Sequence, residues 1–269
     1  MEAWQTWLGG FGHDTYAYPP WIATQMSTDC RRYTRTDNNL LHWCTAKEWL
    51  LKHMPEFDRA FLPPPVSVNA TSMLDDTIAF ALMADRAAPW AAELPLDAKL
   101  RYILPYAGVH EARQNWRPLL FAKFFAIVAN ATSVSEAMGR LVDPNVFTQW
   151  SAHQWADSPL ADDADRLIIR WSSSTSPPVL APLDFAAYGY GSCSAWATLL
   201  AYTARAVGIP ARQVGTPCWN SVYQGVDFRG RAASNQNVSL CWAGGSSTLG
   251  HGGRFLDQHH WAEYLDGTS

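Results

Sequence analysis

Cys193 is the residue in this sequence best suited to covalent chemistry. It follows the glycine-containing stretch 188–192 and begins a run, 193–206, whose apolar residues have helical spacing. The unpaired N–H groups at a helix N-terminus stabilise negative charge, and a thiolate is the nucleophilic form of cysteine. The pattern therefore favours a reactive cysteine at the start of a helix. A small buried cysteine at a helix start is the alternative that this segment alone leaves open.

Two histidines near the C-terminus supply candidate bases for that thiol. His259 and His260 begin a short run with the character of a strand. On a strand, His259 shares one face with Trp261 and Glu263, whereas His260 lies on the other face. A neutral imidazole near pH 7 can take the thiol proton and hold the resulting ion pair. The pattern of residue types leaves both histidines open as candidates.

Three motifs, in this order, resemble the transglutaminase-like superfamily. They are the G-x-C sequence that opens the helix, the R-x-x-G-I-P-A-R turn over 205–212, and H-x-W-x-E over 259–263. The resemblance implies an α+β fold with a transglutaminase-like (papain-like) core. It also implies a cysteine site in which Cys193 is the nucleophile and His259, the first His of H-x-W, is the base.

Further motifs resemble those of a bacterial group of transglutaminase-domain proteins. They are a helix that ends in Met54-Pro55, an L-P-Y…E…W-R motif between 104 and 117, and a Pro-Trp-Asn segment after the G-I-P-A-R turn. Together these motifs cover roughly residues 40–265. Within them, we expect Glu111 and Arg117 to form a structural ion pair, and a position along the substrate groove is the alternative.

The third member of the site is missing from its usual position. A site of this type normally has an Asp or Asn that orients the imidazole. In the superfamily this residue usually lies on the strand after H-x-W-x-E, which would fall beyond Ser269. Asp257 and Glu263 share the strand face of His259, but neither is at the position that the family uses. We therefore expect a core that lacks its last strands, to be completed by a second chain or a missing segment, or else a degraded site.

The segments before the core predict a mainly helical region. A stretch rich in Ser and Pro, 172–182, separates it from the G-x-C helix and the short strand-like runs that follow. We expect an N-terminal arm and helical region over 1–175 and a catalytic core over 176–269. Periodicity predicts helices over 39–54, 73–88, 97–105, 118–129 and 133–141, and strands over 167–169, 212–214, 238–242 and 259–265.

Composition narrows the classes of function. Hydrophobic residues make up 48% of the chain and charged residues 16%, which is typical of a globular protein. The net charge of −4 offers no basic patch for a nucleic acid. No apolar run is long enough to span a membrane and no signal peptide is visible, so we expect a soluble protein of unknown compartment. Five cysteines without a C-x-x-C pair argue against a disulfide framework and a structural zinc site.

Three functional hypotheses follow. The first is a cysteine-dependent acyl-transfer enzyme that acts on a peptide or protein amide, as a peptidase, an amidase or a protein-glutamine transglutaminase, without cofactor or metal. The second is an inactive transglutaminase-like binding module, which the missing third residue and the 14 tryptophans suggest. The third is a metal site, which irregular spacing and the glycines around His251 make the least favoured. Its ligands would be Cys241, His251, His259 and His260.

Overall fold

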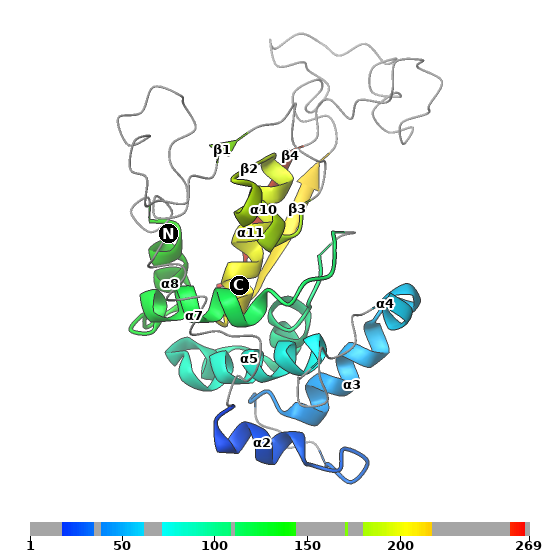
Figure 1. Cartoon of the computed structure of the whole chain (residues 1–269). Coiled ribbons are helices and arrows are strands. Elements are labelled where there is room, and N and C mark those ends of the chain that lie inside the picture. Colours follow the sequence, from blue (N-terminus) through cyan, green and yellow to red (C-terminus); the bar gives the residue numbers. More distant parts are fainter. Residues whose placement is uncertain are drawn as a thin grey trace, which may run out of the picture.

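The computed structural model describes residues 18–34, 39–61, 72–108, 111–143, 170–171, 180–216 and 259–266. These residues form an α+β arrangement. Figure 1 shows one long helix, α11 (Cys193–Ala206), beside a pair of strands, with the helices of the N-terminal region gathered below. The predicted α+β fold with a helical N-terminal region is therefore confirmed.

The first helices begin at local capping signals. α5 (Met73–Ala87) starts with a capping box, in which Ser72 Oγ accepts from the N–H of Asp75 and the Asp75 carboxylate accepts from the N–H of Ser72. The predicted helices over 39–54 and 73–88 are confirmed as α3 (Trp43–His53) and α5. The other helices of this part are α2 (Pro20–Met26) and α4 (Glu56–Phe61).

The middle of the helical region contains both regular and tightened or widened turns. α7 (Arg117–Val128) has Pro118 in its first turn, where the missing N–H costs nothing. α8 (Val134–Leu141) begins at Ser133, and both helices confirm the prediction. The predicted helix over 97–105 is instead a short α-helical turn, α6 (Leu96–Ala98), followed by a π-helical one, η2 (Lys99–Ile103). A 3-10 helix, η1 (Pro89–Glu93), precedes them.

The C-terminal part of the described chain contributes the strands. β3 (Ala211–Thr216) and β4 (His259–Tyr264) pair antiparallel, and the register runs from Ala211 opposite Tyr264 to Thr216 opposite His259. The predicted strands at 212–214 and 259–265 are confirmed, whereas those at 167–169 and 238–242 lie outside the described residues. A second, parallel pair is formed by β1 (Arg170–Trp171) and β2 (Tyr190–Gly191), with α10 (Pro182–Tyr188) before β2.

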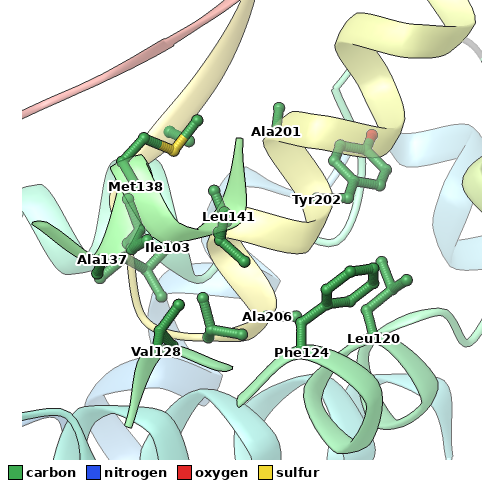
Figure 2. Close-up of a cluster of buried hydrophobic side chains, with 14 of the residues drawn as sticks. Ile103, Leu120, Phe124, Val128, Ala137, Met138, Leu141, Ala201, Tyr202 and Ala206 are labelled. Atoms are coloured by element: carbon green, nitrogen blue, oxygen red, sulfur yellow. The ribbon is translucent and has the colours of Figure 1, made fainter. Parts of the chain in front are cut away.

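One hydrophobic core joins α11 to the helical region. Figure 2 shows Ala201, Tyr202 and Ala206 of α11 above Leu120 and Phe124 of α7, in a cluster that α8 also enters. This core contains buried residues from 88–141 and from 180–211. The division at residue 175 stays a prediction, but the two sides of it share this core, so the helical region supports the helix that carries Cys193.

A second core lies among α2, α3 and α5, and a disulfide closes it. Cys30, after α2, is bonded to Cys44 in α3, with 5.1 Å between the two Cα atoms. The cysteine spacing argued against a disulfide framework, and for Cys30 and Cys44 that expectation is wrong. An odd number of cysteines still allows one bond, and folding brings together two cysteines 14 residues apart without any C-x-x-C spacing.

Candidate active site

Cys193 is the first residue of α11 and is partly exposed. Ser192 occupies the N-cap position, but its side chain makes no capping hydrogen bond, and the first turn contains no acidic residue. The positive end of the helix is therefore not neutralised by these neighbouring side chains. This arrangement can stabilise a thiolate, and the N–H groups of the same turn can stabilise an oxyanion that forms on an attacked carbonyl.

Two glycines shape the chain just before Cys193. Gly189 ends α10 with φ of 72°, a left-handed conformation that favours glycine. Gly191 lies so close to the ring of Phe185 that a Cβ there would be 2.6 Å from Phe185 Cε2. A larger residue at either position would displace the entry into α11. The two glycines thus permit a tight entry into α11.

The topology brings the start of β4 to the same end of the fold as Cys193. After α11 the chain turns at Gly208 and returns as β3, and both strands pack against α11. A helix of 14 residues is about 21 Å long. A strand of six residues spans about 20 Å, so β3 ends near the level of Cys193. Since β4 runs antiparallel to β3, its first residue, His259, lies opposite Thr216 at that end.

His260 follows at the next register position, opposite Gly215. Figure 1 shows the beginning of β4 and the strand β2, which immediately precedes α11, at the same end of the molecule. The backbone arrangement thus brings both candidate bases to the end that carries the thiol. The choice of His259 over His260 as the base stays a prediction.

Gln213 connects β3 to the first turns of α11. Its Nε2 donates to the carbonyl oxygen of Ser194 at 3.4 Å, and its Oε1 accepts from Thr198 Oγ1 at 3.0 Å. Thr198 Oγ1 also lies 2.8 Å from the same Ser194 carbonyl. Sequence reasoning missed this residue, although a glutamine within the predicted strand over 212–214 was an available signal. Gln213 helps to fix the distance between the strand pair and the helix turn that begins at Cys193.

Glu263 has partners of its own and is held on the outer side of the strand pair. Its carboxylate accepts from Arg212 Nε and Nη2 at 3.0 and 2.9 Å, and from Trp261 Nε1 at 3.0 Å. The hydrogen bond from Trp261, followed by those from Arg212, lowers the pKa of Glu263. These contacts give Glu263 a structural role in cross-strand pairing. Asp257, the other candidate on that face, lies outside the described residues, so the third member of the site stays a prediction.

Arg117 does not form the expected ion pair with Glu111. The buried guanidinium instead donates to four backbone carbonyls, those of Ile103 (2.7 Å), Leu104 (3.1 Å), Pro105 (3.3 Å) and Arg205 (2.9 Å). Burial, and next the charge of Arg205, lower the pKa of Arg117 to about 9. Arg117 therefore connects the segment before α7 to the C-terminal end of α11.

Glu111 instead contacts α11 at Tyr202. The Tyr202 hydroxyl and the N–H of Gly108 (2.9 Å) both donate to Glu111 Oε1, and Arg113 lies 3.7 Å away. Burial, followed by the charge of Glu111, raises the pKa of Tyr202. Arg113 also pairs with Asp58 of α4 at 3.0 Å. The L-P-Y…E…W-R motif thus supplies polar contacts that hold α11 against the helical region.

Two cavities formed by described residues lie away from Cys193. The first, of about 210 Å³, is bordered by α3 and the 105–108 segment, with Arg113 at its wall. The second, of about 150 Å³, lies where β3 begins and β4 ends, beside Tyr102. Cys193 lines neither cavity, so neither supports a substrate site around the thiol.

The described ranges also bear on the metal hypothesis and on membrane insertion. Within those ranges, no three His, Cys, Asp or Glu residues gather closely enough to hold a metal ion. Cys241 and His251, which the metal hypothesis needs, lie outside them. None of the described helices combines the length and the apolar character needed to cross a membrane.

Comparison with known proteins adds one finding to this geometry. No curated protein and no solved structure matches the chain. One family model does match, over residues 163–268, which contain α10, α11, β3 and β4. The helix with Cys193 at its start and the strand that begins at His259 both lie inside this match. The family model that matches residues 163–268 is that of the transglutaminase-like superfamily.

Proposed function

We propose that this protein is a cysteine-dependent acyl-transfer enzyme that acts on amide bonds, with Cys193 as nucleophile and His259 as base. The observation that carries the proposal is the position of Cys193 at the N-terminus of α11, where no side chain caps the helix, inside a segment that matches the transglutaminase-like superfamily. The return of β4 to this end of the fold supports a base from this strand, and the choice of His259 over His260 follows the resemblance to the H-x-W motif.

The reaction has two halves. The imidazole takes the thiol proton, and the thiolate attacks the amide carbonyl to give a tetrahedral oxyanion beside the first-turn N–H groups. The C–N bond then breaks, the amine leaves with the proton from the imidazolium, and a thioester remains on Cys193. Water attacks the thioester to give an acid, or a second amine attacks it to give a new amide, and either step restores the thiol. Hydrolysis and amine transfer therefore use the same residues.

The proposal is tested by the reactivity of the thiol towards iodoacetamide. The rate of alkylation of each cysteine is measured by mass spectrometry between about pH 4 and 9, the range over which an activated thiolate differs from an ordinary thiol. We expect Cys193 to react fast well below pH 8, and His259→Ala to abolish that reactivity. His260→Ala is the matched control, because it removes the neighbouring imidazole of the same strand and should leave the profile unchanged.

Two results would contradict the proposal. If Cys193 reacts no faster than Cys218 and Cys241, with the pH profile of an ordinary thiol, the protein has no activated nucleophile and the binding-module hypothesis takes over. If His260→Ala rather than His259→Ala abolishes the fast reaction, the assignment of the base is wrong while the nucleophile stands.

A further inference from the structure

Two exposed tyrosines lie immediately before Cys193. Tyr188 ends α10 and is 58% exposed, and Tyr190 begins β2 and is 36% exposed. Their ring centroids are 6.4 Å apart with an interplanar angle of 47°. The left-handed turn at Gly189 lies between them. Because Tyr190 precedes Cys193 by three residues, their Cα atoms lie within about 11 Å of each other.

An aromatic pair of the core lies beside the backbone that follows these tyrosines. Phe185 is fully buried and meets the half-buried Trp196 of α11 edge-to-face, with 5.1 Å between the ring centroids. Gly191, the residue after Tyr190, lies against the Phe185 ring. The backbone that carries Tyr190 is therefore held by the core, and a surface that is ordered before binding loses little entropy when a ligand binds.

The segment that carries these tyrosines has no charged residue of its own. Residues 185–204 contain no Asp, Glu, Lys, Arg or His. Asp184, the acidic residue just before this stretch, accepts a hydrogen bond from Gln114 Nε2 at 2.7 Å. Arg170 of β1 lies opposite Tyr190 in the strand register. An aromatic side chain can stack on either exposed tyrosine, so the chemistry of the pair favours an aromatic partner.

We propose that Tyr188 and Tyr190 form a recognition surface for an aromatic side chain of a peptide substrate, next to the amide that Cys193 attacks. The inference rests on the proposed function, since it needs Cys193 as nucleophile, and it adds the substrate class. Tyr188 and Tyr190 act on binding and do not touch the reacting atoms. A ring stacked on one of them should favour an aromatic substrate by roughly three- to tenfold.

The test compares two peptide chloromethyl ketones that differ only in the residue before the reactive group, phenylalanine or alanine. The second-order rate constant for alkylation of Cys193 by each is measured by mass spectrometry, with iodoacetamide as the reagent that has no side chain. We expect a clear preference for the phenylalanine probe. Tyr190→Ala and Tyr188→Ala should each reduce this preference by roughly three- to tenfold, the share expected of one aromatic contact.

Two controls separate recognition from folding. Tyr190→Phe keeps the ring and should keep the preference. Tyr264→Ala removes a tyrosine that is 42% exposed at the far end of β4, and it should also leave the preference unchanged. The iodoacetamide rate of all four variants should equal that of the wild type.

Failure of this inference is distinguishable from failure of the proposed function. If iodoacetamide shows an activated Cys193 but the two peptide probes react equally, or if neither alanine variant at the tyrosine pair changes their ratio, the recognition surface is wrong and the nucleophile stands. If iodoacetamide shows an ordinary thiol in the wild type, the proposed function fails and the inference fails with it.

Discussion

Removal of the Tyr202 hydroxyl should destabilise the fold without changing the candidate site. Tyr202 is 1% exposed, and its hydroxyl donates to the buried carboxylate of Glu111. In Tyr202→Phe the ring keeps its stacking on Trp116, where the centroids are 4.6 Å apart, so the change is confined to the hydrogen bond. A hydrogen bond to a charged group contributes about 1.5–3 kcal/mol, and we expect a loss of that size in the free energy of unfolding.

The measurement is urea unfolding followed by tryptophan fluorescence. Tyr264→Phe is the matched control, because that tyrosine is exposed and its substitution should change the free energy of unfolding by less than about 0.5 kcal/mol. Tyr202 lies nine residues after Cys193 on α11, about 13 Å along the helix axis. The rate at which iodoacetamide labels Cys193 in the folded variant should therefore equal the wild-type rate.

The reasoning would be refuted if Tyr202→Phe and Tyr264→Phe had the same small effect on the free energy of unfolding. That result would mean that Glu111 gains nothing from the hydroxyl and that the L-P-Y…E…W-R motif does not hold α11 in this way. A large loss of stability together with a slower labelling rate would instead contradict the separation of this contact from the site.

Three further predictions follow from described contacts. Asp85→Asn should lower the free energy of unfolding, measured in urea, by about 3–5 kcal/mol, because the fully buried Lys99 ammonium loses the counter-charge that lies 2.6 Å away. A double variant with Lys99→Met should recover most of this loss. Gln213→Leu should cost about 1–2 kcal/mol by the same measurement and slow the labelling of Cys193 below pH 8, whereas an unchanged labelling profile would rule out a positioning role. The hydrogen bonds that lower the pKa of Glu263 stabilise the fold fully above the pKa of this group in the unfolded chain. This contribution is lost as the pH falls through the pKa of the folded state. Glu263→Gln should therefore remove about 0.2–1 kcal/mol at neutral pH and progressively less as the pH falls below 4.5, the ordinary pKa of a glutamate, and a loss that stays constant over that range would contradict the pKa shift.

The sequence predicts local features of this fold well and distant pairings poorly. The capping box of Ser72 and Asp75, three residues apart, marks the start of α5. The helix that begins at Cys193 follows from the spacing of the apolar residues in that segment. The partners of Glu111 and Arg117 could not be found in this way. Both lie in one motif, yet each is held by a different part of α11, and only the packed fold brings Tyr202 and the Arg205 carbonyl to them.

The same limit applies to the site. The motifs place Cys193 at a helix start and His259 at a strand start, and the structure confirms both element boundaries. Gln213 was missed because its role depends on two groups of α11, the Thr198 hydroxyl and the Ser194 carbonyl, which lie 15 and 19 residues away in sequence. The disulfide was missed for a related reason, since a spacing rule cannot report that a turn after α2 folds back on α3.

The Cys30–Cys44 bond places a condition on every experiment with this thiol. The proposed chemistry needs a reduced Cys193, whereas the second core contains the disulfide between Cys30 and Cys44. Strong reductants, which are commonly added to keep a catalytic cysteine active, attack disulfides by thiol exchange. A bond that closes a loop of this size contributes about 3 kcal/mol, so its reduction would loosen the contact between α2 and α3. Assays of Cys193 therefore need conditions in which this thiol stays reduced while the Cys30–Cys44 disulfide stays intact.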